Sequence, residues 1–471
     1  MTLYQVLKAH PEPMSINDRL VNELLISKRP NLHHLLLDEV LSLMDHMVED
    51  FGNVIQKESI GKTYENRDMW MLKIDATDYF KHKGVHLNPD RKAILLTGAH
   101  HSRELVSVQM PLYTVLDMLH GLVHGREEAI NLLKHNKYYV MPIVNVDGSY
   151  AIMNHYLQTG ELMLKRKNND RMYEDLQNPC PEAQQGVDIN RNYGYLWGNP
   201  NGPCADDFPG PHAFSEPETK SMRSMLYKYH DDIKFVYNFH AFGPMYIWPY
   251  NAELDNELST SNPEAQKIFN EIWDEATFPS STLHGNAHMT VGYLANGEAN
   301  DYITKTFDIP SVSPELANDN FFSSDFFLQH DHVVREVLRD NHPWILYTLK
   351  KLSGELSLEK GAHVQDASKT HKKYTFKVRN SGLQDWHLGQ ENYTMEIFNS
   401  KNHTIGHVKV PDIKARESAQ LSFTYPSTHP LDFVTVVYNK YHTDSFPTVE
   451  TINFDHAKVP MATSILNMLN L

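Results

Sequence analysis

The residues best suited to chemistry directly follow the apolar run AILL at residues 93–96, which predicts a buried strand. His101 and Glu104 come next, three residues apart, before a helical pattern begins. An imidazole and a carboxylate at this spacing are a ligand pair for a metal ion, and a catalytic zinc takes three protein ligands and keeps a fourth position for water. A third ligand should come from another strand end, and His240 closes the apolar run FVYNFH.

This pattern leaves a second interpretation open. The chain contains 28 histidines, so a His-x-x-Glu match also arises by chance. A histidine at a strand end, with its ring nitrogens satisfied by hydrogen bonds, is the alternative interpretation of His240.

The elements that must position these residues are predicted from apolar periodicity. Five short apolar runs are typical of buried strands, at residues 68–74, 93–97, 138–145, 233–240 and 309–315. Helical patterns, such as residues 106–120 and 333–350, lie between most of them. This alternation predicts an α/β fold with a mixed, mostly parallel central sheet covered by helices on both faces. Such sheets bind ligands at the carboxyl ends of their strands, where His101 and His240 fall.

The pattern of apolar residues changes along the chain and divides it into parts. Apolar residues spaced by three and four predict a helix that ends at Gly52, near the start of a main domain at residues 32–353. From about residue 354 the pattern changes to period-two alternation, which predicts an all-β, sandwich-like domain at residues 354–471. Residues 1–31 are an N-terminal extension.

The composition argues against two classes of protein. A net charge of −16 opposes nucleic-acid binding, because that function uses basic patches against phosphate. No window approaches the run of about 18 apolar residues that a membrane helix needs, so no membrane span is expected. The N-terminus shows no secretory signal, so the chain is either intracellular or preceded by a leader that this sequence lacks.

Several motifs in a fixed order give the sequence a resemblance to a known family. They are SIGKTYENRDMWMLKI, GAHHSRE, MPIVNVDG, LKRK, GVDINRN, FSEPET, NFHAFGPMYIWPY, GYLANGEANDY and SPEL. Through this collinear set, roughly residues 32–352 resemble the zinc metallocarboxypeptidases of the carboxypeptidase A and B type, and chance does not order so many motifs. The resemblance implies the zinc carboxypeptidase fold. It also implies a hydrolase, a metalloprotease that removes single residues from the C-termini of peptides and proteins.

The resemblance assigns the metal centre and the general base. His101, Glu104 and His240 would hold one Zn²⁺ per chain. Asp188 of GVDINRN falls where the family orients a ligand histidine through the ring nitrogen that is not bound to metal. Glu315 of SPEL matches the catalytic glutamate, which takes a proton from the zinc-activated water and delivers it to the leaving amine.

The resemblance also assigns the substrate contacts. Arg166 of LKRK matches the guanidinium that stabilises the oxyanion, although LKRK alone would be interpreted as a solvated charge run. Asn190 and Arg191 match the clamp on the free α-carboxylate, which a bidentate guanidinium holds best. Tyr293 matches the mobile tyrosine that closes over the substrate, and Arg103 the contact with an upstream part of it.

The expected specificity depends on two residues of the pocket that receives the C-terminal side chain. Asn300 falls at the position that the resemblance makes the pocket floor, and it carries no charge. Glu298 lies two positions earlier, and we expect it to be a solvated wall residue worth at most about 1 kcal/mol toward a cation. Neutral C-terminal residues are therefore expected over basic ones.

The two cysteines, Cys180 and Cys204, flank the GVDINRN segment as a disulfide pair does in secreted relatives. The resemblance therefore implies a disulfide bond, and with it a secretory or lysosome-like compartment. Asn392 and Asn402 begin glycosylation sequons in the β domain.

Two other functions stay open at this stage. A peptide-binding relative without turnover would keep the fold, although such proteins usually lack a ligand or the general base. A zinc hydrolase acting on polyglutamate tails or acyl-amino acids would keep the metal, although its motifs diverge from GVDINRN and GYLANGEAND. The sequence does not specify the natural substrate or a ligand of the β domain.

Overall fold

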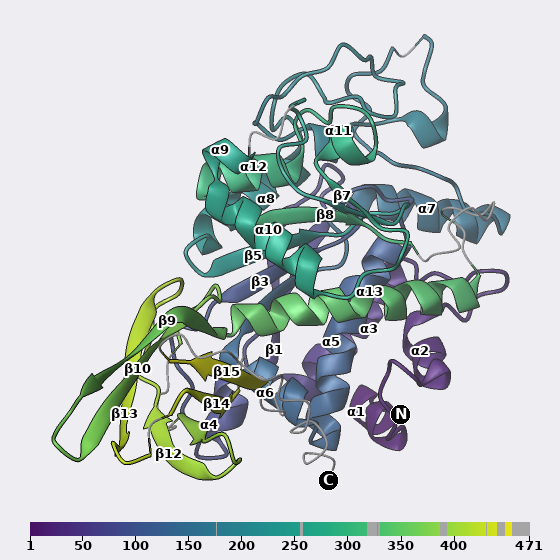
Figure 1. The fold of residues 1–471 in the computed structure, drawn as a ribbon. Helices are drawn as coiled ribbons and strands as arrows, with labels where there is room; N and C mark the ends of the chain where they lie inside the picture. The colour runs from purple at the N-terminus through teal and green to yellow at the C-terminus, as the bar shows by residue number, and fades with distance from the viewer. Residues whose placement is uncertain are drawn as a thin grey trace. The chain divides into compact units, whose positions relative to one another are not determined.

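The computed structural model describes residues 1–175, 177–254, 258–317, 327, 330–386, 393–429, 431–439 and 448–454 (Figure 1). The chain divides into two compact units, Met1–Leu349 and Lys350–Leu471. Each unit has its own sheet or sheets, and each is described by itself.

The first unit is built on one eight-stranded sheet. In spatial order its strands are β1 (Ile55–Lys62), β2 (Asp68–Ile74), β4 (Lys137–Met141), β3 (Ala93–Thr97), β5 (Ile233–Asn238), β8 (Ser311–Glu315), β6 (Met245–Ile247) and β7 (Leu283–Gly285). The pairs β4–β3, β3–β5, β5–β8 and β6–β7 are parallel, and the other pairs are antiparallel. The mixed, mostly parallel sheet predicted from the sequence is confirmed.

Helices cover both faces of this sheet, as the tyrosines of two strands show. Tyr237 of β5 packs its ring against Trp344 and donates or accepts a 2.6 Å hydrogen bond with Thr348, both on α13 (Asp331–Leu352). Tyr139 of β4 packs instead against Tyr229 of α8 (Pro217–Tyr229). Leu95 of β3 pairs with Tyr139 on one side and with Val236 on the other. Tyr237 is one residue beyond Val236, and successive side chains of a strand alternate between faces, so Tyr139 and Tyr237 point to opposite faces of the sheet.

The remaining helices of this unit connect the strands or line their edges. They are α1 (Leu3–Ala9), α2 (Asp18–Leu25), α3 (Leu37–Phe51), α4 (Thr77–Lys81), α5 (Val106–His124), α6 (Glu127–His135), α7 (Val146–Thr159), α9 (Leu258–Ser261), α10 (Pro263–Glu275), α11 (Ala287–Thr290) and α12 (Ala299–Phe307), with 3₁₀ turns at Glu182–Gln184 and Ile189–Arg191. The first helices dock on α5, where the rings of His120 and His124 donate to the main-chain oxygens of His10 and Leu7 at 2.8 and 2.9 Å.

The second unit is all-β in its described residues. One antiparallel sheet has the order β13 (Ser418–Pro426), β10 (His371–Asn380), β9 (Leu356–Asp366), and the other β12 (Thr404–Lys409), β11 (Thr394–Phe398), β14 (Phe433–Tyr438), β15 (Thr448–Asn453). Side chains of both sheets, among them Phe376, Ile397 and Val434, share one hydrophobic core. Two sheets around one core give the sandwich-like arrangement expected from the alternating pattern.

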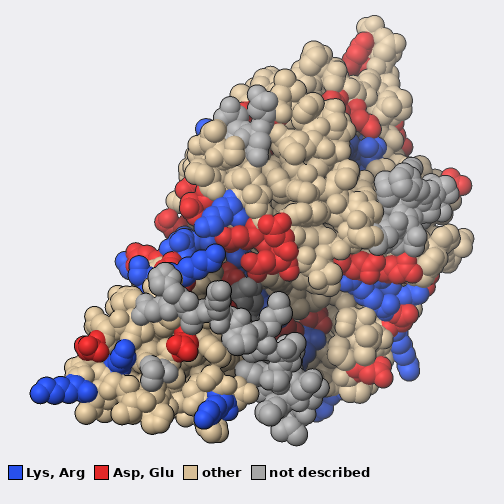
Figure 2. Space-filling model, viewed as in Figure 1, with Lys and Arg blue, Asp and Glu red and all other residues tan. Residues whose placement is uncertain are grey.

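Charge is mixed on the surface. On the face drawn in Figure 2, lysine and arginine side chains lie beside aspartate and glutamate side chains. Among the described helices, none combines the length and apolar character that crossing a bilayer requires.

Candidate metal centre and active site

The chain turns sharply after β3, and this turn delivers the first candidate ligand. A side chain at Gly98 would collide with main-chain oxygens of Ser107 and Pro142, and Ala99 adopts a left-handed φ of 46°. The amide of Ala99 donates to Ser107 Oγ at 3.0 Å, which fixes the turn against the start of α5. His101 therefore leaves the sheet at its carboxyl edge, where it is 3% exposed.

Three predicted ligands converge at this edge. His101, Glu104 and His240 are buried, and one ligand atom from each lies within 4.8 Å of the others. Glu104 Oε1 is 2.8 Å from His101 Nδ1, and Glu104 Oε2 is 2.9 Å from His240 Nδ1. The two Nδ1 atoms are 3.1 Å apart. The described residues hold no other group of this kind.

The hydrogen bonds around His101 indicate that a cation belongs in this cluster. Asp188 is fully buried, and its Oδ1 lies 3.2 Å from His101 Nε2, which places the ring proton on Nε2. The lone pair of His101 Nδ1 then faces a carboxylate oxygen of Glu104, and two acceptors at 2.8 Å repel each other unless a cation lies between them. Two imidazoles and one carboxylate are a donor set that suits zinc.

The ionisation of the ligands agrees with metal binding. Burial raises the pKa of Glu104, but the imidazoles of His101 and His240 lower it by more, so the pKa lies below its ordinary value. Burial lowers the pKa of His240, and the Glu104 carboxylate offsets only part of this effect. A carboxylate and a neutral imidazole are the forms that coordinate a metal.

Arg166 lies beside the metal cluster. Its Nε donates to Asp188 Oδ2 at 2.9 Å, and Nη2 lies 2.9 Å from the same oxygen. Nη1 is 3.7 Å from Glu104 Oε1. Burial lowers the pKa of Arg166, but Asp188 and Glu104 raise it by more, so the guanidinium stays charged. A fixed positive charge therefore borders the cluster.

Glu315 ends β8 next to the cluster. Its Oε2 is buried and has no hydrogen-bond partner among the described residues. Burial raises the pKa of Glu315 well above its ordinary value, and the Glu104 carboxylate raises it further, whereas Arg166 opposes both effects. A buried carboxyl group with a raised pKa beside a metal cluster is suited to proton transfer.

One cavity, open to solvent, joins these groups, and its volume together with the solvent at its mouth is about 380 Å³. Its lining contains most of the residues predicted from the sequence: His101, Arg166, Asn190, Arg191, His240, Tyr293 and Glu315. Tyr293 is 54% exposed, and Arg191 Nη1 donates to the oxygen of Asn190 at 2.9 Å. Arg103 does not line the cavity, and its Nη1 pairs with Asp206 at 3.0 Å.

The structure corrects the prediction for the pocket floor. Asn300 is fully buried but does not line the cavity, because it lies behind Ser313 and donates to Ser313 Oγ at 2.5 Å. Glu298 lines the cavity and is only 5% exposed, so the expectation of a solvated wall residue is wrong. Ser313 Oγ donates to Glu298 Oε1 at 2.7 Å, and the amide of Asn251 donates to Oε2.

Two polar lining residues were not predicted, namely Asn251 and Ser313. Ser313 lies two positions before Glu315 on β8, and side chains two apart on a strand share a face, so this alternation could have identified it. Asn251 follows the WPY segment and carries no comparable signal.

The predicted disulfide is confirmed. Cys180 and Cys204 are joined, and the described chain contains no free cysteine. The bond links the segments on either side of residues 186–192, which contribute Asp188, Asn190 and Arg191 to the site.

Known proteins resemble the chain over its first unit. The sequence model of the family described as zinc carboxypeptidase matches residues 40–342. The chain is 25% identical over 291 residues to carboxypeptidase B of Helicoverpa zea, covering 59% of this chain and 62% of that protein. It is 26% identical over 294 residues to carboxypeptidase A6 of Homo sapiens, covering 61% of this chain and 60% of that protein. The matched part thus spans less than two thirds of either relative.

Solved structures show the same fold. Carboxypeptidase A from Helicoverpa armigera superposes with a TM-score of 0.52 at 26% identity, covering 69% of this chain and 78% of that chain. Thrombin activatable fibrinolysis inhibitor gives a TM-score of 0.54 at 21% identity, covering 74% and 81%. With a family model that matches more than half of its length, and with a buried His-Glu-His cluster at the sheet edge, the chain belongs to the zinc carboxypeptidase family.

Proposed function

We propose that the protein is a zinc-dependent exopeptidase that hydrolyses the C-terminal peptide bond of peptides and proteins. The observation that carries this proposal is one cavity lined by the metal-cluster residues His101 and His240, by Glu315, and by the guanidinium groups of Arg166 and Arg191. These are the parts that peptide hydrolysis with recognition of a free carboxylate requires.

Each part has a chemical role. His101, Glu104 and His240 hold the zinc, which when bound activates a water molecule and polarises the peptide carbonyl. Glu315 accepts a proton from the water and then donates it to the leaving amine. Arg166 donates hydrogen bonds to the oxyanion that forms when water adds to the carbonyl.

Other residues that line the same cavity support exopeptidase action. Arg191 presents a guanidinium that can take the terminal carboxylate through two hydrogen bonds, and Asn190 adds an amide donor. Tyr293 is exposed at the cavity, where its ring covers a bound C-terminal residue. Arg103, outside the lining, is assigned to an upstream part of a longer substrate.

The side-chain pocket supports a preference for basic C-terminal residues. Glu298 is buried and forms no ion pair with any residue in the described ranges; its oxygens accept only from neutral donors on Asn251 and Ser313. A buried carboxylate without a cation is costly, and a lysine or arginine side chain of the substrate would supply the missing charge. The expectation of neutral substrates rested on an uncharged pocket floor at Asn300 and a solvated Glu298, and it is replaced by this assignment.

Catalysis is tested with purified protein supplied with zinc. We expect one zinc per chain by mass spectrometry and hydrolysis of blocked dipeptides with a free C-terminus, whereas the same dipeptides with an amidated C-terminus should resist. Bound zinc without any hydrolysis would indicate a peptide-binding protein. Hydrolysis of acyl-amino acids or polyglutamate tails alone would indicate a specialised amidohydrolase.

The compartment is also a proposal. A disulfide beside the active site favours an oxidising environment, and we assign the protein to a secretory or lysosome-like compartment. Free-thiol titration of denatured protein from its native source checks this assignment, because two reactive thiols would contradict it.

A further inference from the structure

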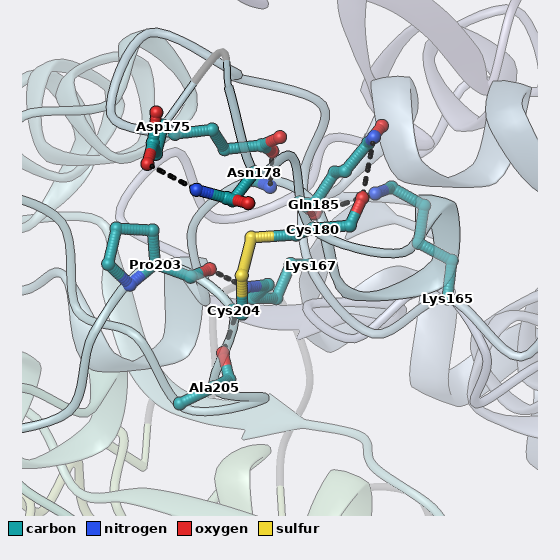
Figure 3. Close-up of a disulfide and its surroundings, with 11 residues drawn as sticks. Lys165, Lys167, Asp175, Asn178, Cys180, Gln185, Pro203, Cys204 and Ala205 are labelled. Carbon is teal, nitrogen blue, oxygen red and sulfur yellow. Dashed lines mark hydrogen bonds between the residues drawn. A yellow bond between two sulfur atoms is a disulfide. The ribbon is translucent and has the colours of Figure 1, made fainter.

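The segment that carries Arg166 has an unexpected environment. Lys165 and Lys167 both have 0% exposure, although LKRK has the composition of a solvated charge run. Of these residues, only Arg166 lines the cavity. Its guanidinium points to Asp188, and the two lysines reach toward the opposite ends of the Cys180–Cys204 disulfide (Figure 3).

Each lysine holds one of the two segments that the disulfide joins. Lys165 Nζ donates to the oxygens of Gln185 at 2.7 Å and Glu182 at 3.3 Å. The Gln185 amide in turn donates to the oxygen of Cys180 at 3.0 Å. Lys165 is therefore hydrogen-bonded to the segment that carries Cys180.

Lys167 is tied to the other side. Its Nζ donates to the oxygens of Pro203 at 2.6 Å and Ala205 at 2.8 Å, the two neighbours of Cys204 in the chain. The disulfide thus joins covalently the two segments whose main-chain oxygens accept from the two lysines, as Figure 3 shows.

The backbone between the lysines is fixed as well. The oxygen of Arg166 accepts from the amide of Ser102 at 3.1 Å and from the Asn145 side chain at 3.2 Å. The Arg166 main chain is therefore anchored at its own carbonyl and by the side chains on either side of it. These contacts fix the backbone from which the Arg166 guanidinium extends to Asp188 beside the metal cluster.

Burying two ammonium groups costs free energy, so a role for Lys165 and Lys167 at these buried positions is expected. Burial lowers the pKa of Lys165 to about 7 and that of Lys167 to about 8. Neither lysine forms an ion pair in the part of the chain that the structure describes, and both donate to main-chain oxygens. Apolar side chains would fill the same space without desolvating a charge, but they would not bind these carbonyls.

We propose that Lys165, Lys167 and the Cys180–Cys204 disulfide form a lysine–disulfide clamp that positions Arg166 for turnover. The lysines are positioning residues, since neither reaches the cavity. This inference rests on the proposed exopeptidase function. It implies that opening the disulfide lowers kcat while the zinc stays bound, because His101 and His240 follow strands β3 and β5 of the sheet, whereas the lysines hold the segment that carries Arg166.

The test compares kcat, KM and zinc content for a blocked dipeptide ending in arginine. Lys165→Met and Lys167→Met should lower kcat by about tenfold, a fraction of the roughly 10²–10³-fold effect of removing an oxyanion donor. In the same variants, KM and the zinc content per chain should each change less than twofold. Lys220→Met is the matched control, because Lys220 Nζ also donates to a main-chain oxygen, that of Ser215 at 2.7 Å, away from the clamp.

A double-mutant cycle separates positioning from general weakening of the fold. In an Arg166→Ala background, Lys165→Met should have no further effect on kcat, because the group that it positions is absent. Equal effects of Lys165→Met in the two backgrounds would overturn the clamp, as would zinc loss that accompanies the fall in kcat.

Reduction tests the clamp without substitution, in case a variant does not fold. A water-soluble trialkylphosphine is suitable, because thiols are themselves zinc ligands. It breaks the S–S bond, becomes the phosphine oxide with oxygen from water, and the two protons of that water yield two cysteine thiols. The reduced protein should keep zinc and lose about tenfold in kcat, on the scale of a displaced oxyanion donor.

The outcomes distinguish this inference from the function on which it rests. If the parent protein cleaves no blocked dipeptide, the proposed function fails and the clamp fails with it. If the parent cleaves the dipeptide and the lysine variants and reduced protein match Lys220→Met, the clamp alone is wrong.

Discussion

His240 and Glu315 face each other across an isolated parallel β-bridge. The amide of His240 donates to the oxygen of Pro314, and the amide of Leu316 donates to the oxygen of His240, both at 2.9 Å. A metal ligand and the proposed general base are therefore held together by main-chain hydrogen bonds. Changing the Glu315 side chain should leave the position of His240 intact.

Glu315→Gln should separate metal binding from catalysis. The amide keeps the size of the side chain but cannot take a proton, so we expect a loss in kcat on the order of 10²–10⁴-fold. Zinc content should equal that of the parent, because Glu315 lies outside the ligand cluster. A variant that hydrolyses blocked dipeptides at the parental rate would refute the assignment of the base.

Asp188→Asn should weaken zinc binding. Asp188 accepts from His101, Arg166 and the amide of Asn190, so an amide in its place loses the charge that orients the ligand ring. Loss of such a partner typically costs about 10–100-fold in metal affinity. Chelator competition measures the change. Asp170→Asn, which removes a buried carboxylate from a neighbouring segment, is the control and should bind zinc as the parent does.

Glu298→Gln should change substrate preference. The parent is expected to cleave a blocked dipeptide ending in arginine with a higher kcat/KM than one ending in phenylalanine. Removing the buried charge should lower the arginine value by about tenfold or more, since pairing of a buried charge is worth several kcal/mol. The phenylalanine value should be unchanged or higher.

The control for this experiment is Glu253→Gln, which removes a nearby carboxylate that accepts from Tyr195 at 2.5 Å and does not line the cavity. A parent enzyme that prefers phenylalanine would show that Glu298 does not select the substrate, without affecting the assignment as an exopeptidase.

The contribution of Glu218 to stability should fall as the pH rises toward 8. Burial, reinforced by the Asp147 carboxylate, raises the pKa of Glu218 to about 8 in the folded protein, above the ordinary value of 4.5. Between these values the folded state holds a proton that the unfolded state has lost, so the free energy of unfolding decreases with pH. One such group contributes up to about 1.4 kcal/mol per pH unit.

Glu218→Gln should flatten this pH dependence, since the amide does not titrate. Urea unfolding of the zinc-saturated protein at several pH values between about 5 and 8 measures the slope. The exposed Glu161→Gln is the control and should retain the parental slope. A Glu218→Gln slope equal to that of the control would contradict the prediction.

Truncation after Ser353 should leave a folded zinc protein. The hydrophobic core of the β unit is made of residues from Leu356 onward, and the metal ligands all belong to Met1–Leu349. Near-ultraviolet circular dichroism and zinc content of the truncated chain check this. A truncated chain that never folds would make the β unit a structural part of the peptidase.

The metal cluster was predictable because its parts follow strong local patterns. His101 and His240 come directly after apolar runs that form β3 and β5, and Glu104 is linked to His101 by a short spacing. The sheet order could not be obtained from these runs alone. The strands β6 and β7 have only three residues each, and the edge strand β1 is largely polar, so none of them gives the periodic pattern of a longer buried strand.

Burial of charged side chains was the part that sequence did not reveal. Glu298 is buried by Asn251 and Ser313, which approach it from distant segments. Lys165 and Lys167 are buried by carbonyl oxygens of loops that the disulfide brings together. Whether a charge is solvated depends on such long-range partners, which leave no periodicity in the chain.

The adjacency of β3, β5 and β8 determines how this family can diversify. Parallel neighbours in a sheet lie about 4.8 Å apart, so the separation of His101, His240 and Glu315 is set by strand pairing. Substitutions at lining residues outside these strands, such as Asn251 and Tyr293, would reshape the cavity without altering that separation. Substrate choice can therefore evolve in the loops while the reaction chemistry is inherited unchanged with the sheet.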